Sequence, residues 1–412
     1  MFINIVVATM LLLFWIPILF LFTEVIAALL PSNTKKKNTV QRLATAILIP
    51  AHYEEYGIAE TLGIIKKQLS PHDRLIVVAD NCHDETAAIS LAMGAEVINR
   101  HNLEFLGKGY ALDYGLQCLQ KSPPDVVIIF DADVVIEPGC IDRLSSTAHL
   151  LNRPVQAAYL LKTCSDDNAT SRISAFAFLF KNLIRPLGLS RLGGGCLLTG
   201  TGMAFPWNLI KNAPLASSNI VEDMQLGIDL AINGNTPVFC PDAVLYSKTA
   251  PNDSAAQAQR IRWEHGHLLT IFKQIGRTIR SAVKQRRLKL FLLTLEIGVP
   301  PLSAFILCWG GAMILVTSCT LGNLLSFNFL TFFLLSGFVL SASILLGWWR
   351  FGRTLLPFRD IMNIPFYILW KVPIYISFLI KPQKGWVRTE RKSDSTTVQQ
   401  DNIKKEHHST NP

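Results

Sequence analysis

Long apolar runs near both ends of the chain enclose a middle region in which short apolar runs alternate with helix-like segments. Residues 1–30 are almost continuously apolar, and two further apolar runs cover residues 290–316 and 329–349. A transmembrane helix needs about 20 consecutive apolar residues, so each run is long enough to span a bilayer. The pattern therefore predicts membrane helices on both sides of one domain at residues 39–280.

The charges beside the first apolar run predict its orientation. No Lys or Arg precedes the run, whereas Lys35, Lys36, Lys37 and Arg42 follow it. A cleaved signal peptide carries its positive charges before the apolar run. We therefore interpret residues 1–30 as a permanent anchor whose C-terminal end faces the cytoplasm.

The two C-terminal runs predict a membrane hairpin. Residues 290–316, kinked by Pro300 and Pro301, and residues 329–349 both have basic outer flanks, and the loop between them, residues 318–328, carries no charge. Because positive flanks stay in the cytoplasm, we expect this loop to lie outside the cell.

A fourth apolar stretch, residues 361–380, differs from the other three. It contains Pro365, Lys371 and Pro373, and both of its ends are basic. These features favour an interfacial or re-entrant helix over a further span. The polar residues 386–412 predict a disordered cytoplasmic tail.

Composition supports a membrane protein. Half of the 412 residues are hydrophobic, 17% are charged and the mean hydropathy is +0.31; a soluble domain has about 25% charged residues. The net charge of +9 comes from basic residues near the apolar runs, which indicates contact with membrane lipid and not with nucleic acid. The eight cysteines are scattered singly, so they support neither a zinc site nor a disulfide framework.

The middle region alternates strands and helices. The predicted strands cover residues 46–49, 74–79, 95–98 and 125–130, and the predicted helices cover residues 58–68, 85–93 and 109–120. This alternation is typical of an α/β domain with a parallel sheet and right-handed crossovers. Ligands of such sheets bind at the carboxyl ends of the strands.

Acidic residues follow these strands. Asp80 comes after the second strand, and Asp131 and Asp133 come after the fourth. One Asp alone is common at turns and helix caps. In extended backbone, however, residues two apart point to the same side, so Asp131 and Asp133 would repel unless a cation lies between them. The pair predicts a Mg²⁺ or Mn²⁺ site shared with substrate phosphates.

Lys108 is a further candidate for phosphate contact. The surrounding Gly107-Lys108-Gly109 lacks the earlier glycine and the following Ser or Thr of a P-loop. Lys108 can still meet a diphosphate as a point charge; the alternative is a solvated loop lysine.

Three later segments carry polar or aromatic groups. Gln259, Arg262 and Trp263 fall on one helical face, which suits a sugar diphosphate, although a Trp–Arg membrane anchor is the alternative. Glu222-Asp223 opens a predicted helix, where a capping role is the plain interpretation. Residues 171–189 mix aromatic side chains with basic ones and predict an amphipathic helix against the membrane, or otherwise a core helix.

The ordered set of motifs resembles the membrane-bound family 2 glycosyltransferases, which include cellulose and hyaluronan synthases and exopolysaccharide transferases. The motifs are ILIPAHYEE at 47–55, the turn at 80–86, GKGYAL at 107–112, DAD at 131–133, TGTG at 199–202, Glu222-Asp223 and QRIRW at 259–263. The resemblance covers the middle region and the layout of the anchors. It implies a GT-A fold, with a Rossmann-like sheet that is parallel at its core. It also implies a hexosyltransferase that uses a nucleotide sugar, usually a UDP-sugar, in one inverting displacement.

The resemblance also implies roles for single residues. Pro50, Glu54 and Asp80 would line the nucleoside pocket; Asp131 and Asp133 would hold the nucleotide and a divalent cation, with Asp133 the more direct metal ligand; Asp223 would be the general base; and Gln259, Arg262 and Trp263 would bind the diphosphate and the acceptor-side sugar. The chain departs from the family at Tyr53, Ala79 and Val221, and none of these departures removes a catalytic group.

The number of spans bears on the acceptor. Synthases that secrete their own polymer usually have more spans after the catalytic domain. We therefore expect transfer to a lipid-linked or growing glycan acceptor in exopolysaccharide biosynthesis, with a separate exporter, in the bacterial inner (plasma) membrane. A processive polysaccharide synthase is the alternative. A transporter would need intramembrane charges and repeats, and a non-catalytic scaffold would be favoured by loss of Asp133, Asp223 or Arg262, which are all present.

Overall fold

The computed structural model describes residues 2–31, 43–163, 168–217, 221–247 and 253–381. The basic residues that orient the first anchor, and the predicted tail at 386–412, lie outside these ranges.

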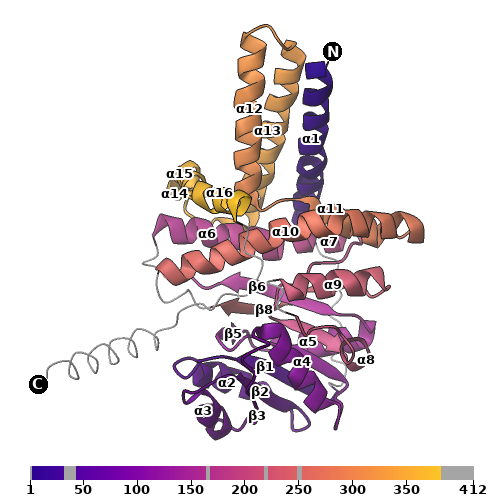
Figure 1. Cartoon of the computed structure of the whole chain (residues 1–412), viewed down its shortest axis with the longest axis vertical. Helices are drawn as coiled ribbons and strands as arrows, with labels where there is room; N and C mark the ends of the chain where they lie inside the picture. Colours follow the sequence, from indigo (N-terminus) through magenta and orange to yellow (C-terminus); the bar gives the residue numbers. More distant parts are fainter. Residues whose placement is uncertain (1, 32–42, 164–167, 218–220, 248–252, 382–412) are drawn as a thin grey trace, which may run out of the picture.

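Three long apolar helices stand side by side at one end of the molecule (Figure 1): α1 (Phe2–Leu29), α12 (Leu302–Leu321) and α13 (Phe327–Gly347). Among the described residues, these are the helices long and apolar enough to cross a membrane, the third continuing through a π-helical turn, η2 (Trp348–Gly352). Phe14 of α1 packs its ring against Phe305 and Phe333. The three helices therefore form one bundle.

The predicted span at residues 290–316 is wrong in its bounds. The structure divides it into α11 (Leu288–Gly298) and α12, with Val299, Pro300 and Pro301 between them. Proline cannot donate a helical hydrogen bond and clashes with the preceding turn, so the helix ends there. In Figure 1, α11 lies with α10 (Asp253–Gln285) across the base of the bundle, and its apolar side packs against α9 (Glu222–Ile232).

Three short helices also lie across the base of the bundle: α14 (Phe358–Ile361), α15 (Ile364–Trp370) and α16 (Val372–Ile380). Pro365 and Pro373 lie in the first turns of α15 and α16, where proline is tolerated. The interfacial or re-entrant position of the segment at 361–380 stays a prediction.

The domain between the membrane helices, here called the sheet domain, is built on a sheet of eight strands in the order β3-β2-β1-β4-β7-β6-β8-β5. The strands are β1 (Thr45–Ala51), β2 (Arg74–Asp80), β3 (Glu96–Arg100), β4 (Val126–Ile129), β5 (Val134–Ile136), β6 (Val155–Leu161), β7 (Met203–Pro206) and β8 (Val238–Ser247). β3, β2, β1 and β4 are parallel, as predicted. Beyond them the sheet is mixed, because β7 is antiparallel to both β4 and β6, β5 is antiparallel to β8, and β6 and β8 are parallel. The predicted sheet that is parallel at its core is therefore confirmed.

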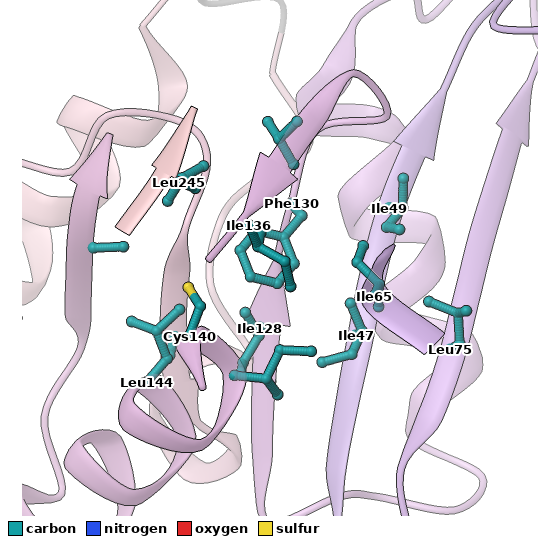
Figure 2. Packing of buried hydrophobic residues seen from close by; sticks show 14 of the residues in the cluster. Ile47, Ile49, Ile65, Leu75, Ile128, Phe130, Ile136, Cys140, Leu144 and Leu245 are labelled. Carbon is teal, nitrogen blue, oxygen red and sulfur yellow. The ribbon is translucent and has the colours of Figure 1, made fainter. Parts of the chain in front are cut away.

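Alternating side chains of the parallel strands fill two cores. Ile47 and Ile49 pack on one face with α2 (Ile58–Lys66) and α5 (Cys140–Leu151), whereas Ala46 and Leu48 pack on the other face with α4 (Lys108–Leu119) and α9. Figure 2 shows Ile47, Ile49 and Ile128 with Cys140 and Leu144 in the first core. Because both faces are covered, the strands are apolar runs and not alternating ones.

The segment at 171–189 joins the sheet domain to the membrane bundle. It forms α6 (Ala169–Leu179), a π-helical turn η1 (Phe180–Ile184) and α7 (Arg185–Arg191). The apolar side chains of Phe180 and Ile184 pack against Ile18 and Leu21 of α1. The predicted amphipathic helix therefore buries its apolar side against a membrane helix of the same chain.

Buried charges cross this junction. The Arg185 guanidinium lies 2.6 Å from a carboxylate oxygen of Glu296 on α11 and 3.5 Å from one of Glu24 on α1, and all three side chains are buried. Beside them, α7 and α1 approach so closely that a Cβ on Gly188 would lie 2.0 Å from the carbonyl oxygen of Glu24.

Gly188→Ala should therefore destabilise the protein. Its methyl group meets backbone and not a flexible side chain, so α7 must move from α1, and overpacking of this kind costs about 1–3 kcal/mol. Thermal unfolding in detergent measures the effect. Gly276→Ala, in α10 where nothing lies within 4 Å of the new methyl, is the control and should keep or slightly raise the melting temperature. Equal melting temperatures for the two variants would contradict the close packing.

Candidate functional site

The parallel strands bring the acidic residues to one rim of the sheet. β3, β2, β1 and β4 run in the same direction, so their carboxyl ends meet at one edge. Asp80 ends β2, Pro50 lies near the end of β1, and Asp131 follows β4 by two residues. These three positions therefore lie at one edge of the sheet, as predicted from the strand ends.

Asp80 is held by charge and by the neighbouring turn. Its carboxylate lies 2.5 Å from the Arg100 guanidinium, and both side chains are buried. Burial raises the pKa of Asp80, and Arg100 offsets part of that rise. The Asp80 carbonyl also lies 2.6 Å from Nδ1 of His52. The buried Glu54 donates its backbone N–H to Thr86 Oγ1 at 2.8 Å, which fixes the turn after β1.

Asp131 and Asp133 lie in a turn and not in extended backbone. β4 ends at Ile129, β5 begins at Val134, and Ala132 and Asp133 form the turn between them. The two carboxylates therefore do not lie on one side of an extended strand, as the sequence had predicted. The Asp131 backbone N–H instead donates to Thr201 Oγ1 at 3.0 Å, which fixes this turn beside the TGTG segment.

Lys108 contacts Asp131. It is the first residue of α4, and its ammonium group forms an ion pair with Asp131 and donates to the Gly200 carbonyl at 2.6 Å. Burial alone would lower the pKa of Lys108, but the charges of Asp131, Glu222 and Asp223 together raise it. Lys108, which the sequence predicts to contact a diphosphate, is therefore charged and lies between acidic groups. Its ammonium group is close to any ligand that binds at Asp131.

Glu222 and Asp223 begin α9, and Asp223 lies close to Gly200 and Lys108. A Cβ at Gly200 would lie 3.1 Å from Asp223 Oδ2 and 3.6 Å from Lys108 Nζ, and Gly200 has a φ of 86°. Both the space and this left-handed backbone require glycine. Burial, followed by the charge of Asp223, raises the pKa of Glu222 to about 7. Burial also raises the pKa of Asp223, against the backbone N–H of Met224 and the nearby Lys108 and Lys181.

An aromatic row connects this rim to α10. The Tyr159 ring on β6 lies 5.0 Å from the Phe178 ring, which lies 5.2 Å from the Trp263 ring on α10. Burial and then the charges of Asp131 and Asp133 raise the pKa of Tyr159, whereas the charge of Arg262 lowers it.

The structure therefore brings Trp263 and Arg262 towards the Asp131–Asp133 turn. Gln259, one helical turn earlier on α10, is half-buried.

The donor set fits a divalent cation that shares its ligands with a substrate. Within the described part of the chain, no group of three or more His, Cys, Asp and Glu side chains could hold a metal on its own. Asp131 and Asp133 supply carboxylate oxygen, the ligand that Mg²⁺ and Mn²⁺ prefer, and a cation bound by one or two carboxylates normally completes its shell with phosphate and water.

Two residues of this region were not found from the sequence. Arg100 pairs with Asp80, and Tyr159 lies near Asp131, Asp133 and Arg262. The place of Arg100 at the carboxyl end of a predicted neighbouring strand was an available signal. Tyr159 gave no such signal, because β6 joins the sheet out of sequence order.

The sequence profile described as "Glycosyltransferase like family 2" matches residues 42–266, which is more than half of the chain. The chain therefore belongs to the family 2 glycosyltransferases. The matched region holds every candidate residue named above, from Pro50 to Trp263.

Comparison with known proteins adds relatives of this class. The probable glycosyltransferase YdaM of Bacillus subtilis is 25% identical over 266 residues, which cover 61% of each protein. An uncharacterized protein of Methanocaldococcus jannaschii is 32% identical over 107 residues, which cover 26% of this chain and 42% of that protein. The chain thus spans less than two thirds of the length of these relatives.

A solved structure shows the fold. The mannosyltransferase of Pyrobaculum calidifontis, in complex with GDP-mannose and Mn²⁺, superposes with a TM-score of 0.51 at 16% identity, covering 84% of this chain and 98% of that one. The fold is GT-A: a mixed α/β sheet, here accompanied by three helices long enough to span a membrane.

The raised pKa of Glu222 predicts how stability depends on pH. Its folded pKa of about 7 lies above the ordinary value of 4.5. The folded state therefore binds this proton more tightly than the unfolded state, and stability falls as the pH rises between those values. Glu222→Gln removes this titration, so its stability should fall less than that of the wild type between about pH 5 and pH 8. Denaturant unfolding at several pH values measures the two slopes, and equal slopes would contradict the shift.

Proposed function

We propose that this chain is an inverting glycosyltransferase that transfers a hexose from a nucleotide sugar, a UDP-sugar in particular, to a lipid-linked or growing glycan acceptor. The observation that carries the proposal is the position of Asp223 across Gly200 from the Lys108–Asp131 pair, within a family 2 domain. The candidate acceptor base therefore lies next to the candidate phosphate-binding rim.

The rim suits the nucleotide part of the donor. Asp80, Pro50 and Glu54 lie where a nucleoside binds at the strand ends of a GT-A sheet, and the Arg100–Asp80 ion pair holds that wall in place. Asp131 and Asp133 would hold a Mg²⁺ or Mn²⁺ ion. When bound, that ion would neutralise charge on the donor diphosphate. The mannosyltransferase with a similar fold was solved with a nucleotide sugar and Mn²⁺, which supports this assignment.

Asp223 suits the general base. The acceptor hydroxyl oxygen attacks the anomeric carbon, its proton passes to the Asp223 carboxylate, and the bond from that carbon to the diphosphate oxygen breaks. A hydroxyl is a poor nucleophile until a positioned base takes its proton, and a base works best with a pKa near the working pH. The raised pKa of Asp223 moves it in that direction. We assign Arg262 to the departing diphosphate, together with Gln259 and Trp263 on α10.

The membrane helices support action at a bilayer surface. We place the domain on the cytoplasmic face of a bacterial inner (plasma) membrane, where nucleotide sugars occur, in exopolysaccharide biosynthesis with a separate exporter. A processive polysaccharide synthase remains the second candidate, favoured by Trp263 at the membrane side of the site. Incubation with a radiolabelled UDP-sugar and separation of products by length distinguishes single-sugar transfer from polymer formation.

Removal of the metal should stop the reaction. With chelator present, release of nucleotide from a UDP-sugar should fall to background and recover on addition of Mg²⁺ or Mn²⁺. Asp133→Ala should reproduce the loss, because one remaining carboxylate, already paired with Lys108, holds the ion weakly. Asp142→Ala, on α5 and outside the rim, is the matched control and should leave activity unchanged. Full activity of the wild type in chelator would remove the metal from the mechanism.

Asp223→Asn should separate catalysis from binding. The amide keeps the shape but cannot take a proton, so turnover should fall by about 10²–10⁴-fold. Donor binding, measured calorimetrically with UDP, should be retained. Glu222→Gln should lower turnover less than Asp223→Asn does. Loss of donor affinity in Asp223→Asn, with turnover of bound donor unchanged, would make this residue a binding group and place the base elsewhere.

A further inference from the structure

A buried ion pair joins α10 to the C-terminal segment of the described chain. Glu264 of α10 uses both carboxylate oxygens: Oε1 accepts from the Lys371 ammonium group at 2.5 Å, and Oε2 accepts from the Tyr375 hydroxyl at 3.0 Å. Lys371 lies between α15 and α16, and Tyr375 lies on α16. The side chains of Glu264 and Lys371 are 12% and 6% exposed, so solvent screens their attraction little.

Neighbouring residues of α10 contact the same segment. His265 Nε2 lies 2.9 Å from the Ile374 carbonyl oxygen, and the His265 ring lies 5.2 Å from the Phe378 ring. One helical turn earlier, the Arg260 guanidinium lies over the Trp370 ring at 5.6 Å. We call these contacts, together with those of Glu264, the α10–α16 joint. The joint holds α10 through several directional contacts and not through apolar packing alone.

The same stretch of α10 carries residues of the candidate site. Arg262 and Trp263 directly precede Glu264 in the helix, and Trp263 belongs to the aromatic row that leads to β6. A Cβ on Gly266 would lie 2.5 Å from the side chain of Val221, the residue before the Glu222-Asp223 pair. Because α10 contacts the beginning of α9 so closely, a shift of α10 moves Arg262 and Trp263 relative to Asp223.

Packing alone leaves α10 room for such a shift. A cavity of about 100 Å³ lies beside the joint, and its lining includes Trp263, Glu264 and Lys371. A close-packed interior resists displacement because its side chains interdigitate without free space, but here free space adjoins the indole of Trp263. A charge-assisted hydrogen bond adds geometric specificity as well as energy. The two donors on Glu264 therefore define one position of α10 where the cavity would permit several.

We propose that Lys371 and Tyr375 are positioning residues for the transferase reaction: they hold Glu264 and thereby fix Arg262 and Trp263 relative to Asp223. The inference rests on the proposed function, which assigns Arg262 and Trp263 to the departing diphosphate. The family profile matches residues 42–266. The catalytic unit therefore includes a segment that lies outside the region shared with the family.

Turnover and nucleotide binding, measured separately on the full chain in phosphatidylcholine nanodiscs, test the proposal. Lys371→Met should lower turnover of a UDP-sugar by about 10- to 100-fold, because a misplacement of about 1 Å can cost that much. UDP affinity, measured calorimetrically, should change far less, because Asp80 and Asp131 are held by the sheet and not by α10. Lys371→Arg keeps the charge and the donors and should retain most of the turnover. Tyr375→Phe should lower turnover less than Lys371→Met does.

A second buried ion pair of the same segment supplies the matched control. Asp360 joins α14 to α6 through Arg172 at 2.6 Å. Asp360→Asn should lower the melting temperature as Lys371→Met does, yet leave the turnover of the folded protein unchanged. An equal loss of turnover in Asp360→Asn would overturn the proposal, because the effect would then be general loosening. If Lys371→Met fails to fold, Tyr375→Phe, which keeps the ring, takes its place under the same criterion.

The double variant Glu264→Gln/Lys371→Met tests whether Lys371 acts through Glu264. Residues that act through one shared contact have non-additive effects. The double variant should therefore be about as slow as the slower single variant. Losses that multiply, or unchanged turnover in folded Lys371→Met, would overturn the proposal.

Hydrogen–deuterium exchange gives a measurement that needs no turnover. Exchange of the backbone amides at residues 259–266 should be faster in Lys371→Met than in the wild type, and unchanged in Asp360→Asn. A wild type that releases no nucleotide from any UDP-sugar would contradict the proposed function. Unchanged exchange in Lys371→Met would overturn the joint itself, and full turnover of this variant beside an active wild type would contradict this inference alone.

Discussion

Arg185 is the point on which the arrangement of this molecule depends. Its guanidinium is buried between Glu296 of α11 and Glu24 of α1, so one cation joins a membrane helix, the helix layer below the bundle and the α7 segment of the sheet domain. Removing one member of such a buried group leaves an uncompensated charge, at a cost of about 3–5 kcal/mol. The apolar contacts of α1 with η1 give no comparable directional constraint, because the burial of apolar surface is non-directional.

The same constraint, that a buried charge needs an opposite charge, orders the region between this junction and the rim of the sheet. Lys371 forms an ion pair with Glu264. Burial lowers the pKa of Lys181, and the charges of Glu264 and Asp223 offset part of that fall. Lys108 forms an ion pair with Asp131 and lies near Asp223. Basic and acidic groups therefore alternate from α15–α16 to the turn after β4.

Glycines set the spacing of the candidate site. A Cβ at Gly200 would lie 3.1 Å from Asp223 Oδ2 and 3.6 Å from Lys108 Nζ, so there is little space for a side chain at this position. Gly202 has a φ of 65°, and a Cβ there would lie 2.4 Å from the Leu245 side chain. The turn that links β7 to the rest of the rim thus depends on missing side chains. The glycine turn therefore sets how close Asp223, the proposed base, lies to Lys108 and Asp131, where the donor phosphates are proposed to bind.

Local sequence determined the parts of this protein that depend on neighbours along the chain. The parallel strands from Thr45 to Ile129, the helices between them and the acidic strand ends follow from apolar runs and turn residues, because both faces of these strands are buried. The proline pair at 300–301 marked the helix break, although the run of apolar residues hid that α11 lies below the bundle and not within it.

Only the tertiary structure decided the rest. The antiparallel strands β7 and β5, the turn conformation of Asp131–Asp133, and the pairing of Arg100 with Asp80 all depend on segments far apart in sequence. The Lys108–Asp131 contact and the ion pair of Glu264 with Lys371 depend on them as well. Their partners are chosen by burial and charge in three dimensions, where removing a charge from water makes one nearby counter-charge decisive, and no local spacing in the sequence encodes that choice.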